Sequence, residues 1–319
     1  MPQRILEPGQ IETAGPRSPP RVRLPARERV FARRAERLRE RSAGHPLAGF
    51  LQLLALVCDA QHDALAAFEP APLPPGRLAL AREHAMPPLL ATDRLPDARW
   101  HDVLHGIAAS LDATPGLPDA AVRLVARLRD APAAWLERQA DALLGVREEA
   151  IDVAAAPFVM AALQVRFVAS TAAFAAEDVA PLDVRTVCPI CGSAPVASVV
   201  AAHGTHAGYR FLHCALCATE WHRVRVQCTH CGASGKDIAY RTLARRAAVD
   251  DIAVADAEAV RAETCDACRS YRKILYQERD TAVEPIADDL ASLALDLLLA
   301  EEGYQRASGN PLLWQRPGD

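Results

Sequence analysis

The sequence predicts an α+β fold: an N-terminal α-helical domain, then two small β metal modules, then a C-terminal helix. Three observations support this prediction. The first half of the 319-residue chain is rich in Ala, Leu and Arg, with apolar residues at helical spacing. The second half holds eight of the nine cysteines in four Cys-x-x-Cys pairs, between short β-leaning runs. Half of the residues are hydrophobic, which is enough for a substantial core.

The N-terminal half divides into a disordered extension, residues 1–24, and a helical domain, residues 25–182. Within the helical domain, Leu51, Leu54 and Cys58 share one face of a helix. The proline-rich segment 69–76 must end that helix, because proline removes a hydrogen-bond donor and clashes with the preceding turn. Helices are expected at residues 27–42, 46–68, 97–113, 117–129, 132–145 and 155–175.

The C-terminal half is expected to contain metal module 1 (residues 183–226), metal module 2 (residues 227–278), and a helix with a tail (residues 279–319). Strands are predicted at residues 195–200, 209–213 and 220–227, the first two forming a hairpin. In the third, Val224 and Val226 alternate with arginines, which is typical of a half-buried strand. The last helix is expected over residues 285–302, capped by Gly303. Its apolar face contains Ile286, Leu290, Leu293 and Leu297.

The cysteine pairs lie within 81 residues and are Cys188/Cys191, Cys214/Cys217, Cys228/Cys231 and Cys265/Cys268. Two intervening residues allow both thiolates of a tight turn to point at one ion, which supplies half of a tetrahedral shell. A glycine after the second cysteine relaxes such a turn. Gly192 and Gly232 occupy this position, whereas Ala218 and Arg269 stand there in the other two turns.

Pairing in sequence order therefore gives each site one turn with glycine and one without. Site 1 then contains Cys188, Cys191, Cys214 and Cys217, and site 2 contains Cys228, Cys231, Cys265 and Cys268. The hairpin expected between Cys191 and Cys214 favours this order, because it brings its own ends together. An interleaved arrangement, the first pair with the third, stays open.

Metal binding is the interpretation that best fits four tandem pairs. Chance or a thioredoxin-type redox turn explains one pair but not four, and disulfides require an oxidising compartment. Tetrahedral cysteine sites suit zinc or a single iron, and eight thiolates could also hold iron–sulfur clusters. Sites closed by four ligands leave no position for a substrate, so we expect a role that is structural in part.

Other metal-ligating or reactive side chains receive simpler interpretations. The histidines near the cysteines are expected to be surface groups or groups beside the ligands, namely His203, His206, His213, His222 and His230. His101 and His105 share a helix face, but aspartate replaces the glutamate of a zinc-protease helix and no third ligand is evident. Cys58 is expected to be a small core residue.

Charge and hydropathy limit the location and the partners. The net charge of −4 gives no whole-molecule argument for nucleic acid or an anionic membrane. Residues 185–246 carry a surplus of +6, from eight bases and two acids, and residues 280–302 carry seven acids and no base. These two segments could pack together, or the basic one could meet an external partner. The N-terminus lacks a secretory apolar core and no apolar run is long enough to span a bilayer, so a cytoplasmic protein without membrane insertion is expected.

These residues resemble the bacterial formate dehydrogenase accessory protein family, FdhE. The resemblance is specific over residues 185–313 and weaker over the helical half. The segments that carry it are CPICGSAPVAS (188–198), RFLHCALCATEWH (210–222), VRVQC (224–228), AETCDAC (262–268), YRKILYQE (271–278), IADDLASL (286–293) and Asn310–Pro311.

The resemblance implies a cytoplasmic maturation factor that is not an enzyme. Such a factor binds the catalytic subunit of respiratory formate dehydrogenase before its export and is required for its activity. The resemblance also implies rubredoxin-like (zinc-ribbon-like) modules, with one iron ion in each four-cysteine site and zinc as the alternative. All eight paired cysteines fit the four motifs of the family. The oligomeric state stays open.

Two other functions compete with this expectation. A zinc-ribbon nucleic-acid binder would use Arg210, Arg223, Arg225, Arg241, Arg245 and Arg246. The sequence has few aromatic residues among these arginines for base stacking, so no nucleic-acid partner is expected. A rubredoxin-like electron carrier would show a reversible iron potential and no stable partner.

Overall fold

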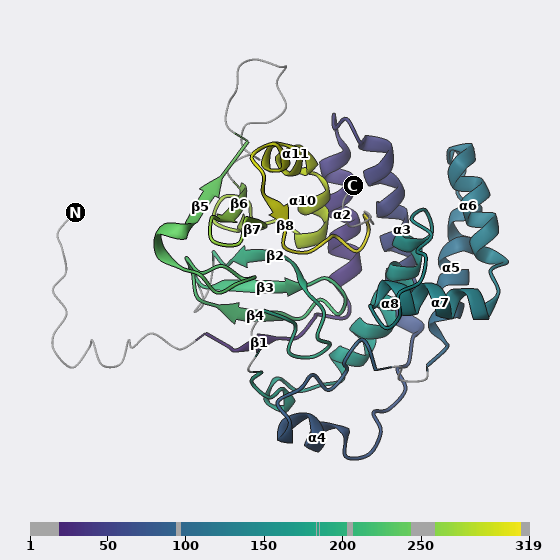
Figure 1. The fold of residues 1–319 in the computed structure, drawn as a ribbon. Coiled ribbons are helices and arrows are strands. Elements are labelled where there is room, and N and C mark those ends of the chain that lie inside the picture. Colours follow the sequence, from purple (N-terminus) through teal and green to yellow (C-terminus); the bar gives the residue numbers. More distant parts are fainter. Residues whose placement is uncertain are drawn as a thin grey trace, which may run out of the picture.

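The computed structural model describes residues 19–93, 97–182, 184, 186–202, 207–243 and 259–313. A helical region lies beside a β-sheet, and a C-terminal helical segment packs between them (Figure 1). The predicted α+β fold class is thereby confirmed, with the helical domain first, the cysteine-bearing strands next and helix last.

The helical region contains seven α-helices in its described part. They are α2 (Val30–Ser42), α3 (Ala48–Ala67), α4 (Arg77–Glu83), α5 (Trp100–Asp112), α6 (Asp119–Arg129), α7 (Ala133–Leu143) and α8 (Ala156–Ala172). Six of them match the expected segments, and α4 is an addition. Helix α8 lies at the centre, because α3, α5 and α7 all contact it. Nearly all of its residues are buried, which is why its sequence is apolar on every side.

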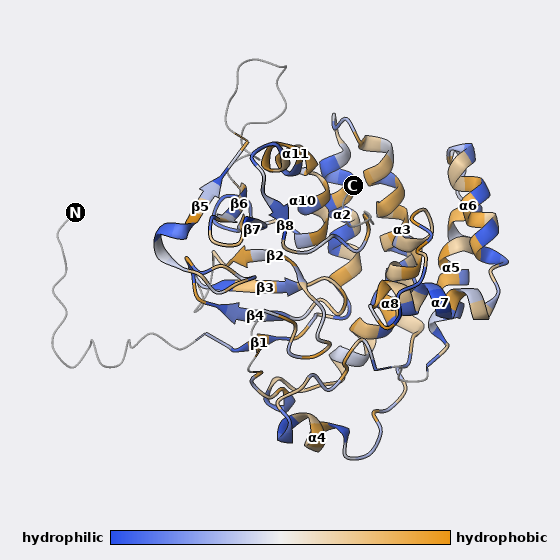
Figure 2. Cartoon of the chain, in the orientation of Figure 1, coloured by the Kyte–Doolittle hydropathy of each residue, from blue (hydrophilic) through white to orange (hydrophobic). Residues whose placement is uncertain are grey.

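All the described strands belong to one eight-stranded sheet in the order β1-β4-β3-β2-β7-β6-β5, with β8 added to β7. Strand β2 is apolar and fully buried, whereas β4 at the other side of β3 is hydrophilic (Figure 2). The strands are β1 (Val22–Arg23), β2 (Pro195–Val200), β3 (Arg210–Cys214), β4 (Glu220–Arg223), β5 (Ile238–Arg241), β6 (Val260–Cys265), β7 (Ser270–Tyr276) and β8 (Gln305–Arg306).

The sheet contains a structural repeat. Strands β2, β3 and β4 form an antiparallel meander, and β5, β6 and β7 form a second one with the same strand order. A parallel pairing of β2 with β7, from Ser198 opposite Ile274 to Val200 opposite Tyr276, joins the two meanders. The two metal modules expected from the sequence therefore share one sheet.

Three expectations about element bounds need correction. The strand predicted over residues 220–227 ends at Arg223, and Val224 and Val226 beyond it are 61% and 46% exposed. Val226 has φ of 58°, so the chain turns there and cannot continue as a strand. The C-terminal helix is divided into α10 (Pro285–Leu290) and α11 (Leu293–Glu301), and Leu297, expected on the apolar face, is 69% exposed.

A disordered extension was expected over residues 1–24. Residues 1–18 lie outside the described part of the chain. The last part of the extension is ordered, because Val22 pairs with Trp221 and Arg23 with Glu220 in the sheet. The predicted cap Gly303 follows α11 with φ of 78°, the left-handed conformation that ends a helix.

Helix α10 holds the helical region and the sheet together. Its two adjacent aspartates are both fully buried and have different partners. Asp288 accepts hydrogen bonds from Arg37 and Arg41 of α2. Asp289 accepts from Arg306 of β8 and lies 3.3 Å from Lys273 of β7. Asp288 thus binds α10 to helix α2, and Asp289 binds it to strands β7 and β8.

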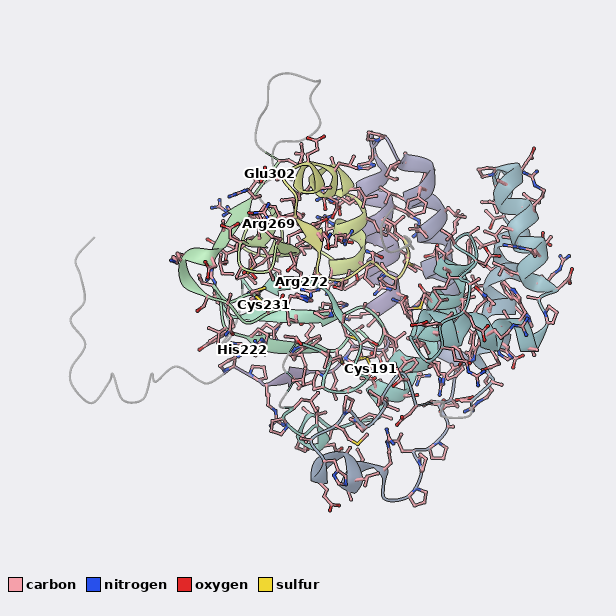
Figure 3. The ribbon with its side chains drawn as sticks, in the orientation of Figure 1. Cys191, His222, Cys231, Arg269, Arg272 and Glu302 are labelled. Carbon is pink, nitrogen blue, oxygen red and sulfur yellow. The ribbon has the colours of Figure 1, made fainter. Side chains whose placement is uncertain are left out.

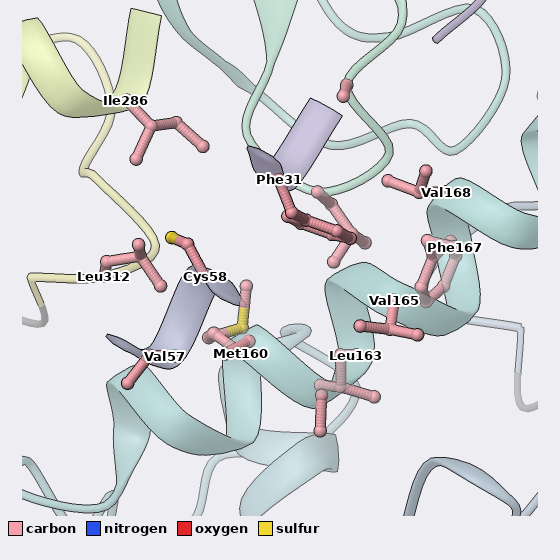
Figure 4. Packing of buried hydrophobic residues seen from close by; sticks show 14 of the residues in the cluster. Phe31, Val57, Cys58, Met160, Leu163, Val165, Phe167, Val168, Ile286 and Leu312 are labelled. Atoms are coloured by element: carbon pink, nitrogen blue, oxygen red, sulfur yellow. The ribbon is translucent and has the colours of Figure 1, made fainter. Parts of the chain in front are cut away.

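The apolar core is continuous across these regions. One cluster of buried residues extends from Val22 to Leu312. Cys58 of α3 lies within it, with Ile286 and Leu312 of the C-terminal segment nearby (Figure 4). The prediction that Cys58 is a core residue is confirmed, and burial raises the pKa of its thiol to about 12. None of the helices in the described part of the chain combines the length and the apolar character needed to cross a membrane.

Candidate metal centres

The eight paired cysteines gather into two groups in sequence order. Within each group, the four sulfur atoms lie within 4.8 Å of one another. The separations are 3.5 Å for Cys188–Cys217 and 3.4 Å for Cys191–Cys214 in site 1. In site 2 they are 3.8 Å for Cys228–Cys268 and 3.7 Å for Cys231–Cys265.

These separations agree with the size of a metal site. Four sulfur atoms about 2.3 Å from one tetrahedral ion lie about 3.8 Å apart, close to the observed separations. Both groups could therefore bind a metal ion. The interleaved arrangement is not the one that the structure has.

The four cysteine turns, defined as Cys188–Gly192, Cys214–Ala218, Cys228–Gly232 and Cys265–Arg269, share one backbone conformation. The residue after the second cysteine has positive φ in all four: 74° at Gly192, 57° at Ala218, 84° at Gly232 and 54° at Arg269. The expected contrast between glycine turns and plain turns is thus one of residue type and not of geometry. Ala218 and Arg269 adopt a left-handed backbone conformation that is unfavourable for residues with a side chain. The shape of the turn therefore prevails over the backbone preference of these two residues.

Backbone hydrogen bonds hold the turns closed. The N–H of the first cysteine donates to the carbonyl five residues later in three turns: Cys188 to Ser193, Cys214 to Thr219 and Cys228 to Ala233. In the fourth turn, Cys265 and Ser270 are partners in the β6–β7 ladder. Each turn is therefore the tight end of a small antiparallel pair, and a ladder strand of the sheet leads into or out of it.

Backbone N–H groups and hydroxyls also point at the sulfur atoms. The Cys214 sulfur accepts from the N–H groups of Leu216 and Cys217, each at 3.4 Å. The Thr219 hydroxyl lies 3.1 Å from the Cys217 sulfur, and the Ser270 hydroxyl lies 3.0 Å from the Cys268 sulfur. Such donors stabilise negative charge on a thiolate, which is the form that binds a metal.

Site 1 is enclosed by the helical region. All four of its cysteines are 0% exposed. Two N–H groups of the segment after α4 donate to its first turn, Leu89 to the Ile190 carbonyl and Ala91 to the Cys191 carbonyl, both at 2.9 Å. From α8, the amide of Gln164 donates to the Ala215 carbonyl in the second turn at 2.7 Å. Both turns of site 1 are therefore bound by the helical region.

The surroundings of site 1 separate the pKa values of its thiols. Burial, with contributions from the neighbouring thiols, raises the pKa of Cys188 and of Cys214 well above the ordinary value. Burial also acts to raise the pKa of Cys217, but hydrogen bonds from the other three thiols and from Thr219 outweigh it and hold this pKa well below the ordinary value. An ion that binds all four thiolates would displace the protons of the two groups with raised pKa.

Site 2 lies farther from the helical region than site 1, as the positions of Cys231 and Cys191 in Figure 3 show. Cys228 and Cys265 are buried, but Cys231 is exposed and Cys268 is half-buried. The pKa of Cys268 is lowered to about 7, because hydrogen bonds from Ser270 and the neighbouring thiols outweigh the effect of burial. One ligand of site 2 is thus accessible from solution.

Two buried arginines lie on the inner side of site 2. Arg272 is 5% exposed and donates to the Thr229 hydroxyl at 2.9 Å, next to Cys228. Burial, with the nearby charge of Arg210, lowers the pKa of Arg272 to about 9. Arg210 is 0% exposed and bonds both carboxylate oxygens of Glu263, at 2.7 and 3.0 Å. Arg272 therefore brings a positive charge close to Cys228, whereas the charge of Arg210 is balanced by Glu263.

The described histidines near the cysteines belong to neither group. His203 and His206 lie outside the described residues. His213 is buried, with its Nδ1 atom 3.4 Å from a Glu220 carboxylate oxygen. His230 is exposed, and its backbone N–H donates to the Cys228 sulfur. His101 and His105 form the other histidine pair that the sequence singled out. His101 lies 2.6 Å from Glu137, and no group of ligands close enough to hold a metal forms there among the described residues.

The arginines expected for a nucleic-acid surface do not share one face. Arg210 is buried against Glu263, and Arg241 is bonded to Glu302 of the acidic segment. Arg245 and Arg246 lie outside the described residues. Most acids of α10 bind other bases, from α2, β7 and β8. The basic and acidic segments thus meet through the Arg241–Glu302 pair and through the packing of α10 on β2.

Sequence reasoning missed Thr219, Ser270 and Arg272 as groups that support the sites. A signal for the first two exists in the sequence. Each site ends with Cys-x-x-Cys-x-Thr or Cys-x-x-Cys-x-Ser, which places a hydroxyl two residues after the last cysteine. Arg272 has no such signal, because its contact with Thr229 depends on the register of the sheet.

Comparison with known proteins gives a consistent result. Three domains of one family match the chain: "FdhE, N-terminal" over residues 19–183, "FdhE, central domain" over 187–225 and "FdhE, C-terminal domain" over 226–313. A "Protein FdhE homolog" from Pseudomonas aeruginosa is 42% identical over 316 residues, 98% of each chain. "Protein FdhE" from Salmonella enteritidis is 38% identical over 301 residues, which is 94% of this chain and 93% of the relative.

A solved structure agrees with these matches. The crystal structure of the FdhE protein from Pseudomonas aeruginosa superposes with a TM-score of 0.79 at 40% identity. The superposition covers 92% of this chain and 99% of the crystallised chain.

Proposed function

The chain belongs to the FdhE family, and from this membership we propose that it is an accessory factor that docks on the catalytic subunit of a formate dehydrogenase during assembly. The observation that carries the proposal is the pair of four-sulfur groups, one enclosed by the helical region and one open to solution. The enclosed site stabilises the fold, and the open site shapes a surface for a partner. The partner's assembly takes place in the cytoplasm.

The eight cysteines are the proposed metal ligands, with one iron ion in each site. Four thiolates in a tetrahedron suit iron and zinc alike, and iron would supply one-electron chemistry that zinc lacks. Neither site has an open ligand position for a substrate, which supports a role without catalysis. Metal analysis and the visible spectrum of freshly purified protein test this part: ferric tetrathiolate is red, and a colourless protein with two zinc ions contradicts it.

Docking is tested by co-purification with the catalytic subunit. The tagged wild-type chain should retain the subunit, and the Cys231→Ser/Cys265→Ser variant should lose the site 2 metal and the subunit together. Cys58→Ala is the matched control, because this ninth cysteine is buried in the core and belongs to neither site. Retention of the subunit after complete metal loss contradicts a role of the metal modules in docking.

One observation favours a second function, a rubredoxin-like electron carrier. Exposure of Cys231 leaves a ligand of site 2 accessible to another redox protein. This function requires iron and a reversible potential, and it predicts no stable complex with the catalytic subunit. The nucleic-acid alternative is weakened by Arg210, whose guanidinium is fully buried and bonded to Glu263.

A further inference from the structure

A short exposed segment, Val224–Arg225–Val226, separates the last strand of the first meander from the first cysteine turn of site 2. We call it the tip. Its two valines are 61% and 46% exposed, which places them among the most exposed large hydrophobic side chains in the described part of the chain. Two exposed valines within three residues, beside a candidate metal site, mark the tip as a candidate contact surface for another protein.

The backbone of the tip is strained at Val226. Its φ of 58° lies in the left-handed region, which is unusual for any residue with a side chain and most unusual for a β-branched one. Glycine or asparagine would adopt this conformation more readily. The chain therefore keeps an exposed apolar side chain where a polar or small residue would fit the backbone better.

Gln227 connects the tip to the site 2 cysteines. Its backbone pairs with Ser234 across the third cysteine turn, and its side-chain amide donates to the Gly232 carbonyl at 3.2 Å. Its carbonyl accepts from the buried Arg210 at 3.1 Å. Since this turn carries Cys228 and Cys231, the shape of the tip depends on the turn that a site 2 metal would hold.

The charge around the tip is mainly positive. Arg223, Arg225 and Lys236 lie near it in the sequence, with Glu220 and Asp237 just outside them, and Glu220 is already paired with Arg23 and His213. Arg225 is exposed, and its guanidinium donates to the Gly208 carbonyl at 3.4 Å. A basic and apolar surface complements a segment that presents acidic and apolar residues.

We propose that the tip, with His230 and Cys231 beside it, is a docking surface for an acidic and apolar segment of a partner protein. This inference rests on the proposed function and locates the contact, with the formate dehydrogenase catalytic subunit as the partner. A protein is favoured over nucleic acid because two exposed valines contribute nothing to a phosphate contact. Among the aromatic residues that could stack on bases, Phe211 and Trp221 are buried, and Tyr209 and Tyr240 are half-buried.

The test uses the full-length, metal-loaded chain and a charge reversal at the tip, Val224→Asp/Arg225→Glu. The sequence offers a matched control on α6, Val122→Asp/Arg123→Glu, where the same dipeptide is exposed and Val122 is 44% accessible. The tip variant should bind the purified catalytic subunit about 10-fold more weakly or worse, as expected for the centre of an interface. The control should bind within about 2-fold of wild type, and metal content and thermal midpoint should be unchanged in both.

The possible outcomes distinguish a failure of the docking surface from a failure of the proposed function. Wild-type affinity in the tip variant overturns the docking surface and leaves the proposed function standing. Failure of the wild-type chain to bind the subunit overturns the proposed function and the docking surface with it. Binding of a DNA duplex of arbitrary sequence that the tip variant loses and the α6 control keeps overturns the assignment to a protein segment. Arg225→Ala supplies a second readout, because it should reduce the weakening of subunit binding by added salt.

Discussion

Site 1 and site 2 are assembled from turns of the same backbone conformation, placed at the same positions in two repeated meanders, yet their surroundings differ. Site 1 has no exposed sulfur and is bonded to the helical region through Leu89, Ala91 and Gln164. Site 2 exposes Cys231 and is backed by two buried arginines. The comparison teaches that one local motif occurs in two environments, and that the neighbours of the motif decide how far its sulfur atoms are exposed.

The largest expected effect comes from removing one site at a time. Cys191→Ser/Cys214→Ser and Cys231→Ser/Cys265→Ser each delete one ligand from both turns of a site. Structural tetrathiolate sites contribute about 10–16 kcal/mol of binding free energy to folding in small zinc domains. Because site 1 also holds the helical region, we expect its variant to lose cooperative unfolding of the whole chain.

The site 2 variant should keep the site 1 metal and a cooperative transition at a lower temperature. Circular dichroism during heating, together with the metal content per chain, measures both outcomes. Equal losses in the two variants would show that burial does not distinguish the sites.

The joint between the meanders is the next target. Arg210 of β3 and Glu263 of β6 form a buried pair, 0% and 3% exposed, so Arg210→Met leaves a carboxylate buried without its main partner. We expect a loss of about 3–5 kcal/mol in the free energy of unfolding, measured in urea. Arg39→Met is the control, because its pair with Asp59 is exposed and contributes less than about 1 kcal/mol. A small loss at Arg210 would mean that this ion pair contributes little to joining the two meanders.

Accessibility should separate the sites kinetically. A chelator attacks a tetrathiolate site through its exposed ligand, so metal release should show a fast phase from site 2 and a phase about 10-fold slower or more from site 1. Absorbance of the released metal complex follows both phases. The fast phase should be missing from Cys231→Ser/Cys265→Ser. A single phase in the wild-type chain would contradict the difference in burial.

Local patterns of the sequence were sufficient for the cysteine sites and most helices. Cys-x-x-Cys spacing fixes the shape of a turn, and a long 3.6-residue period fixes a helix, so these features need no distant information. The alternation at Val224 and Val226 predicted a strand wrongly, because alternation reports burial only where the chain stays extended. The positive φ of Val226 is not visible in the sequence, since valine is a residue that disfavours it.

Long-range features could not be predicted. The parallel pairing of Ser198 with Ile274 joins residues from separate meanders, and nothing near either residue indicates the other. The same holds for the burial of Arg210, which only the competing nucleic-acid hypothesis placed on a surface. The difference in exposure between the two sites depends on contacts of this long-range kind. The sequence alone therefore indicated two sites without a difference between them.

The smallest expected effect comes from two equivalent glycine-to-alanine substitutions, one in each site. They compare the sites directly, because each adds a single carbon atom at the same position of the turn. Gly192 and Gly232 follow the second cysteine of the first and third turns with φ of 74° and 84°, so alanine pays the same conformational cost of about 1–2 kcal/mol at both. Their neighbours differ. A Cβ at Gly192 would lie 2.7 Å from Leu90 Cδ1 of the segment that closes site 1, whereas a Cβ at Gly232 meets no atom within 4 Å. Gly192→Ala should therefore lower the free energy of unfolding more than Gly232→Ala and should quicken metal release from site 1. Leu90→Ala in the Gly192→Ala background should recover part of the difference, and equal costs at the two glycines would show that the helical region does not press on site 1.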